Sequence, residues 1–183
     1  HGAGSTRSNV LDQAQVLARH GYGVLMVDAR GHGDSDGRAM DFGWLGESDI
    51  RAAVSFLLNE PGVDPGRIGV LGLSMGGEEA IGALGSDPRI AAVVAEGATG
   101  RTDADFAWLP EVYGVFGRLQ RVLDWLLYSL TDILTKASKP RSLAEAAEMA
   151  GQRPILLIAA GEVADEQHAA EHIQRESPAN TSV

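Results

Sequence analysis

Two short segments place a serine between glycines at the spacing expected around a catalytic nucleophile. Gly72-Leu73-Ser74-Met75-Gly76 and Gly33-Asp34-Ser35-Asp36-Gly37 both have the pattern Gly-x-Ser-x-Gly. A serine hydroxyl attacks a carbonyl efficiently only when a base takes its proton, and flanking glycines allow the sharp turn that presents the hydroxyl. Because so short a pattern also occurs by chance, the surrounding sequence must decide between the two serines.

The context favours Ser74. The apolar run Ile68–Leu71 precedes it, and residues 77–84 after it have helical character. Strand, sharp turn and helix in this order are what the nucleophile pattern requires. Ser35 lies between two aspartates without either element, as a loop serine does. We therefore predict that Ser74 is the nucleophile and that the N–H of Met75, at the helix start, stabilises the oxyanion.

The elements that must position Ser74 follow from the hydrophobic pattern. Apolar runs alternate with helix-period segments, which predicts an α/β fold with a mostly parallel sheet and helices on both faces. Buried strands are expected over residues 22–28, 67–73, 90–96 and 154–160. Helices are expected over residues 8–20, 47–59 and 164–176, and Ser142–Glu145 is a capping box that begins another.

Residues 97–153 interrupt this alternation. They contain no strand signal, and apolar residues recur every three to four positions from Val115 to Leu134. This spacing predicts a long amphipathic helix with a wide apolar stripe. Its polar positions mix arginines with aspartates, which makes a membrane-surface helix the weaker interpretation.

Two more segments, in chain order with the Ser74 motif, carry a family resemblance. His1-Gly2-Ala3-Gly4 resembles the loop that completes the oxyanion hole of α/β-hydrolases, and residues 27–37 resemble the turn after their fourth strand. The chain resembles this superfamily over nearly its whole length, in particular the branches of dienelactone hydrolases, prolyl-oligopeptidase-like peptidases and serine-aminopeptidase-like esterases. Under the resemblance, residues 97–153 are a helical lid within a single domain, residues 1–183.

The resemblance implies a serine hydrolase without a cofactor. Its substrate would be a small molecule with a carboxylic ester or, less favoured, a peptide or amide bond, and Ser74 would carry the acyl group. Ala3 would donate the second oxyanion hydrogen bond, with Gly2 permitting the turn. Trp108 and Trp125 of the lid would line an apolar acyl pocket.

The rest of the catalytic triad is less well defined. The acid should follow the strand at residues 154–160, where Asp165 is preferred over Glu162; Glu96 is a further alternative. The base should be a histidine after one more strand, but His168 and His172 lie on a predicted helix. The resemblance thus implies a fragment cut at both ends, inactive alone, whose sheet has a gap or an altered pairing beside residues 22–28.

Two other functions compete with this interpretation. His168-Ala169-Ala170-Glu171-His172 has the H-x-x-E-H pattern of some zinc peptidases. A zinc ion needs a third protein ligand, and few residues follow, so we expect no metal site. The other alternative is an α/β-hydrolase fold that binds a ligand without catalysis.

Composition excludes several classes of protein. The chain has 183 residues, no cysteine, and 15 basic against 25 acidic side chains, giving a net charge of -10. It can form neither disulfides nor thiolate metal sites, and its acidity argues against nucleic-acid binding. No apolar run is long enough for a stable membrane span, so we expect a cytoplasmic protein.

Overall fold

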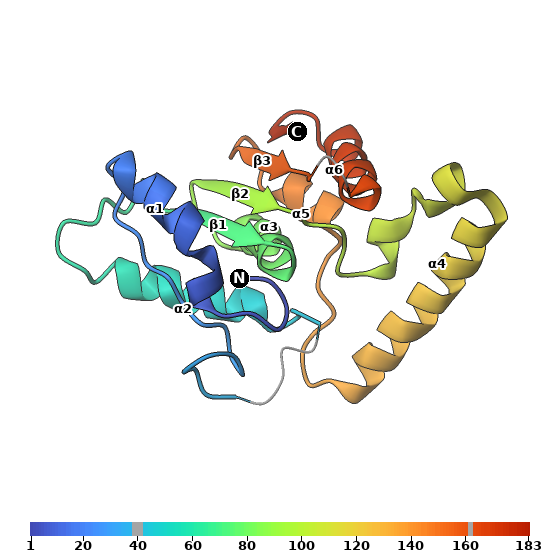
Figure 1. The fold of residues 1–183 in the computed structure, drawn as a ribbon, viewed down its shortest axis with the longest axis horizontal. Coiled ribbons are helices and arrows are strands. Elements are labelled where there is room, and N and C mark those ends of the chain that lie inside the picture. Colours follow the sequence, from blue (N-terminus) through green and yellow to red (C-terminus); the bar gives the residue numbers. More distant parts are fainter. Residues whose placement is uncertain (38–41, 161–162) are drawn as a thin grey trace.

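The computed structural model describes residues 1–37, 42–160 and 163–183. A parallel sheet runs through the centre of the molecule (Figure 1). Its strands lie in chain order and are β1 (Gly69–Leu73), β2 (Ala92–Glu96), β3 (Ile155–Ile158) and β4 (Thr181–Ser182). Because all four are parallel, their carboxyl ends meet at one edge of the sheet, where side chains from several loops can converge.

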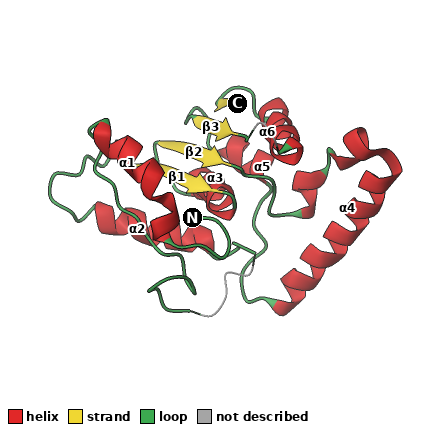
Figure 2. Cartoon of the chain, viewed as in Figure 1, coloured by secondary structure: helices red, strands yellow, loops and turns green. Residues whose placement is uncertain are grey.

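Helices surround the sheet and fill the connections between strands (Figure 2). They are the 3-10 turns η1 (Arg7–Val10) and η2 (Asp103–Phe106) and the α-helices α1 (Leu11–Arg19), α2 (Gly46–Leu57), α3 (Met75–Ser86), α4 (Leu109–Leu134), α5 (Leu143–Met149) and α6 (Ala164–Glu176). The predicted α/β class with a mostly parallel sheet is therefore confirmed. Helix α3 is central, because it packs on β1 and β2 and also against α2 and α5.

The main core lies between one face of the sheet and α3 with α5. Along β3, Ile155 and Leu157 point into this core and are buried, whereas Leu156 and Ile158 point the other way and are 42% and 43% exposed. In Figure 1, α1 lies beside the β1 end of the sheet, away from β3. The sheet is thus fully covered on the α3 side and partly covered on the other.

The strand predicted over residues 22–28 is wrong. This segment belongs to no strand and makes no ladder hydrogen bonds, and Tyr22 and Val27 are 57% and 41% exposed. An apolar run forms a strand only when a neighbouring strand accepts and donates its backbone hydrogen bonds. The sheet instead begins at β1, in line with the expected gap or altered pairing.

Strand β4 is the opposite case, because no strand was predicted there. Thr181 and Ser182 pair in parallel with Ile155 and Leu156 of β3. The sequence analysis placed no further strand after residues 164–176, and the structure corrects this point. The strand is only two residues long, too short for any period-two pattern.

The segment 97–153 divides into two parts. Helix α5 packs into the main core, where Leu143 and Ala147 have no exposed surface. Helix α4 extends away from the sheet as a long rod (Figure 1), after a break at Gly114, whose φ is 56°. Among the described residues no helix combines the length and apolarity needed to cross a bilayer.

Candidate active site

Ser74 sits where β1 ends and α3 begins, so the strand and the helix expected around it are both present. Its φ of 51° and ψ of −122° lie in a region that non-glycine residues rarely adopt. Its N–H donates to the Glu96 carbonyl at 2.6 Å, which ties the turn to the end of β2. Such a backbone is maintained only by the packing around it, and strain of this kind clusters at functional sites.

The glycines around Ser74 make the turn possible. A Cβ at residue 72 would overlap the Gly76 carbonyl, so strand and helix can cross this closely only with glycine at residue 72. A Cβ at residue 76 would lie 2.7 Å from the His1 carbonyl oxygen. Both of these close approaches therefore depend on the absence of a side chain.

The N-terminal loop lies directly against Ser74. A Cβ on Gly2 would be 3.3 Å from the Ser74 Cβ, and Gly2 begins a turn that the Ser5 N–H closes by donating to the Gly2 carbonyl at 3.2 Å. The next residue, Ala3, is exposed. On the other side, α3 begins at Met75, and helix geometry leaves its N–H without an intrahelical acceptor. The sequence-predicted residues Gly2, Ala3, Ser74 and Met75 are thus brought together.

Two histidines fasten this loop to the turn at residues 28–37. His1 Nε2 accepts from the Ala29 N–H at 3.0 Å, and His32 Nε2 accepts from the Gly4 N–H at 3.3 Å. In each ring Nδ1 faces a carbonyl oxygen, 2.9 Å away for His1 and 3.1 Å for His32, so Nδ1 carries the proton. In each ring Nε2 is occupied by a backbone N–H and is not free to take a proton from Ser74.

The turn at residues 28–37 is built on a buried carboxylate. The Asp28 side chain is 2% exposed and accepts from the Arg7 and Asp34 N–H groups at 2.7 and 3.0 Å, and from the Arg7 guanidinium. These hydrogen bonds, with the backbone ones foremost, hold the pKa of Asp28 below its usual range. Ser35 donates to the Asp28 carbonyl at 2.7 Å, which gives the second Gly-x-Ser-x-Gly segment a structural role.

Two buried glutamates follow Ser74 on α3. Glu78 accepts from the N–H groups of Thr99 and Gly100 at 3.1 and 3.0 Å, which anchors the loop after β2. Glu79 is 5% exposed, and its Oε1 has no hydrogen-bond partner among the described residues. Burial raises the pKa of Glu79 to about 8. Its carboxyl fills the space beside Gly46, where a Cβ would overlap it.

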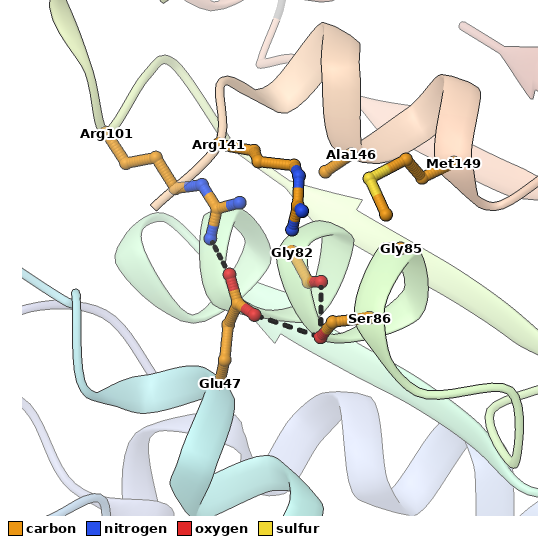
Figure 3. Close-up of a pocket in the computed structure, with 8 residues that line it drawn as sticks. All are labelled: Glu47, Gly82, Gly85, Ser86, Arg101, Arg141, Ala146 and Met149. Carbon is orange, nitrogen blue, oxygen red and sulfur yellow. Dashed lines mark hydrogen bonds and ion pairs between the residues drawn. The ribbon is translucent and has the colours of Figure 1, made fainter. Parts of the chain in front are cut away.

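A second buried network crosses the other end of α3 (Figure 3). Arg101 is 2% exposed, and its Nη1 donates to Glu47 Oε1 at 2.6 Å. Glu47 also accepts from Ser86 Oγ at 3.0 Å. A Cβ at Gly82 would overlap the Arg101 guanidinium, so the guanidinium fits beside α3 only because residue 82 has no side chain. The network joins α2, α3 and the loop after β2.

The acid candidates lie at the carboxyl edge of the sheet. Asp165, in the first turn of α6, is exposed and accepts from the Tyr113 hydroxyl at 2.6 Å, a hydrogen bond that raises the pKa of Tyr113. Glu96 ends β2 and accepts from the Gln13 amide at 3.2 Å. Glu162 lies outside the described residues. Neither the Asp165 nor the Glu96 carboxylate hydrogen-bonds to the Ser74 side chain.

Glu166 is a residue that the sequence analysis missed. Its Oε2 accepts from the Ala160 N–H at 2.9 Å, just beyond β3, and a Cβ on Gly97 would lie 3.1 Å from its Oε1. The carboxylate therefore spans the ends of β2 and β3. Its position next to Asp165, on the following residue of the helix, was the only signal in the sequence.

The remaining histidines do not form a base or a metal site in the described part of the chain. His20 Nδ1 contacts the Val16 carbonyl, and the His168 ring packs on Trp108 with centroids 5.5 Å apart. Across residues 1–37, 42–160 and 163–183, no cluster of three His, Cys, Asp or Glu side chains could hold a metal ion. Ser74 Oγ itself has no hydrogen-bond partner within these ranges.

The two tryptophans lie in different environments. Trp108 is 2% exposed and packs with Leu109 and Ala169, so it supports the segment from inside and offers no surface to a ligand. Trp125 is 54% exposed and lines an open pocket of about 320 Å³ between α4 and η2. The other lining residues are Asp103, Pro110, Arg118, Arg121 and Val122.

Comparison with known proteins identifies the fold and the family of this site. The family model for serine aminopeptidase, S33, matches residues 1–175. A Pyrococcus furiosus esterase superposes with a TM-score of 0.65 at 25% identity, covering 99% of this chain and 68% of that one. A hypothetical protein from Pseudomonas aeruginosa gives 0.66 at 18% identity, covering 100% and 71%.

Curated relatives match over a shorter stretch. A thiohydrolase of Aspergillus aculeatus is 36% identical over 98 residues, which are 51% of this chain and 30% of the relative. A quorum-quenching protein of Acinetobacter baumannii is 31% identical over 99 residues, 52% of this chain and 33% of the relative. The matched part is thus about a third of each relative's length.

Proposed function

The chain belongs to the serine aminopeptidase S33 family of α/β-hydrolases, and from this premise we propose that it carries the nucleophile of a serine hydrolase that acts on carboxylic esters. The observation that carries the proposal is Ser74 itself. It is an exposed serine at φ 51°, between a strand and a helix, with the Gly2 loop against it. The names of the relatives, esterase and thiohydrolase, support an oxygen ester or a thioester over a peptide bond.

In the proposed reaction, Ser74 Oγ attacks the substrate carbonyl carbon while a base takes the hydroxyl proton. The carbonyl oxygen becomes an oxyanion, which the N–H groups of Met75 and Ala3 stabilise. Collapse of this intermediate expels the alcohol or thiol, which receives the proton, and leaves an acyl group on Ser74. Water then attacks the acyl group by the same route and regenerates the serine.

The acid and the base are the less defined parts of the proposal. Asp165 is the preferred acid, and the Tyr113 hydroxyl holds it at the carboxyl edge of the sheet. His1 and His32 have their Nε2 atoms occupied by backbone N–H groups. We therefore infer that the base is supplied from outside these 183 residues and that the isolated chain turns over esters poorly, since loss of the triad histidine reduces kcat on the order of 10⁶-fold.

We propose further that helix α4 acts as a lid over the acyl part of the substrate. The open pocket of about 320 Å³ places Trp125 with Pro110 and Arg121, a surface suited to an apolar chain beside a polar group. Replacement of Trp125 by alanine should change the preference for acyl-chain length in a series of nitrophenyl esters. An unchanged preference would remove α4 from the substrate site.

The decisive experiment labels the nucleophile. A fluorophosphonate probe is added to the natural full-length protein and to its Ser74→Ala and Ser35→Ala variants, and the labelled peptide is identified by mass spectrometry. Ser35 is the matched control, because it lies in the same Gly-x-Ser-x-Gly pattern but donates to the Asp28 carbonyl. We expect label on Ser74 only. A full-length protein that folds but takes no label would favour a hydrolase fold used for binding alone.

A further inference from the structure

The outer side of α4 carries an apolar surface with no partner among the described residues. Its ten members are each between 43% and 82% exposed. They are Val115, Phe116, Leu119, Val122, Leu123, Leu126, Leu127, Leu130, Ile133 and Leu134. We call them the α4 stripe. The spacing of three and four residues along a helix places all ten on one side.

The helix attaches to the body by its other side. Gly117, Tyr128 and Thr131 are the buried residues of α4 beyond its first turn. The Tyr128 ring stacks on Trp44 and Phe106, with centroids 6.4 and 6.3 Å away. An amphipathic helix usually buries its apolar side, but α4 uses its small and polar residues for this contact. The α4 stripe is therefore left uncovered by the described residues.

The size of the stripe is that of a protein interface. Ten large side chains that are about half exposed leave roughly 1,000 Å² of apolar surface in water, more than the 300–600 Å² patch of a typical monomer. A stable interface buries about 800 Å² on each partner. Residues 115–134 span about 30 Å at 1.5 Å per residue, so one helix of equal length would cover the stripe.

The order of residues in the stripe indicates that the covering helix is α4 of a second copy of this chain. The pattern is the same when read from either end. Val115 corresponds to Leu134, Phe116 to Ile133, Leu119 to Leu130, Val122 to Leu127 and Leu123 to Leu126. A two-fold axis through the middle of two antiparallel copies would bring each member opposite its counterpart, which is the self-complementarity that a symmetric dimer requires. Within the stripe, residues 116, 119, 123, 126, 130 and 133 have the alternating spacing of a coiled-coil seam.

Charge complementarity points to the same partner. Arg118 and Asp132 lie on the same edge of the stripe, fourteen residues apart around its midpoint. In the antiparallel arrangement, Arg118 of one copy is level with Asp132 of the other, and the pair occurs twice. A negatively charged bilayer fits less well, because Asp124 and Asp132 offset the two arginines and the net charge is -10.

We propose that the α4 stripe is the interface of a symmetric dimer, in which α4 of a second copy of this chain packs antiparallel on it. Sedimentation of the natural full-length protein at about 100 µM should give twice the mass of one chain. The paired substitution Leu123→Asp and Leu126→Asp should weaken the dimer about 100-fold or more. Phe56→Asp on α2 is the matched control: Phe56 is 54% exposed but lies outside the stripe, so its replacement should leave the dimer intact.

Cysteine cross-linking tests the orientation, because the chain has no cysteine of its own. Under mild oxidation, Leu119→Cys mixed with Leu130→Cys should form a covalent heterodimer, whereas each variant alone stays uncrosslinked. Circular dichroism checks that every variant is folded, and Leu123→Gln with Leu126→Gln serves if the aspartates perturb α4. A monomer at 100 µM, a dimer insensitive to the stripe, or self-linking of Leu119→Cys would each overturn the proposal. A monomer that binds lipid vesicles would assign the stripe to a membrane surface instead.

Discussion

Glu79→Gln should change how the stability of this protein depends on pH. Burial raises the pKa of Glu79 from 4.5 to about 8, so the folded chain holds a proton there that the unfolded chain releases near pH 4.5. Between these values the unfolded state binds fewer protons, and the free energy of unfolding therefore falls as pH rises. At about 1.4 kcal/mol for each pH unit, the wild type loses about 3 kcal/mol between pH 5 and pH 7.5.

Glutamine keeps the shape of the neutral carboxylic acid and does not titrate. The variant should match the wild type at pH 5 and exceed it by about 3 kcal/mol at pH 7.5, measured as free energy of unfolding by urea titration at both pH values. Taking the difference between the two proteins cancels the titration of the histidines. Glu148→Gln, at an exposed position on α5, is the control and should show no such trend. A constant difference between Glu79→Gln and wild type from pH 5 to pH 7.5 would refute the reasoning.

Three further predictions follow from contacts around the site. Ala3→Pro removes the proposed oxyanion N–H and should lower kcat of the full-length enzyme on the order of 100-fold, whereas Ala3→Ser should preserve it. Gly72→Ala would force a Cβ into the Gly76 carbonyl and should destabilise the fold by about 3 kcal/mol or more in urea unfolding. Arg101→Met removes the cation that pairs with Glu47 and should lower stability by about 3 kcal/mol, and the double variant with Glu47→Gln should recover part of that loss.

The helices show what local sequence can predict. Residues 164–176 form α6 with the expected bounds, and Ser142 caps α5 by accepting from the Glu145 N–H at 3.2 Å, as its capping box indicates. Both features depend on residues within about four positions of each other, so the sequence contains nearly all the information needed. The start of α4 at Leu109, before the apolar pattern begins, reflects the Gly114 break that joins a second short helix to it.

The strands show where prediction from local sequence fails. Residues 22–28 have a composition much like that of the buried strands, yet they lack a ladder partner, whereas Thr181 and Ser182 form β4 because β3 lies beside them. Strand formation is decided by a neighbour that is distant in sequence, and composition says little about that neighbour.

The candidate site likewise has parts that local sequence could predict and parts that it could not. The turn at Ser74 and its glycines could be predicted, because strand, turn and helix are contiguous in the sequence. The acceptor roles of His1 and His32 could not, because each depends on a contact spanning 28 residues. Glu166 was missed for a related reason, since only the fold shows that it bridges the ends of two strands.

Because α3 is buried, we expect it to unfold only when the whole molecule unfolds. Ala80, Ile81, Ala83 and Leu84 have no exposed surface, and the helix is enclosed by β1, β2, α2 and α5. Its amide hydrogens should exchange with solvent only through global unfolding, whereas those of α4 exchange through local fluctuations that leave the sheet intact. The unusual backbone of Ser74 thus begins the least mobile helix of the protein. We therefore expect that local opening of helix α4 leaves the backbone conformation of that serine unchanged.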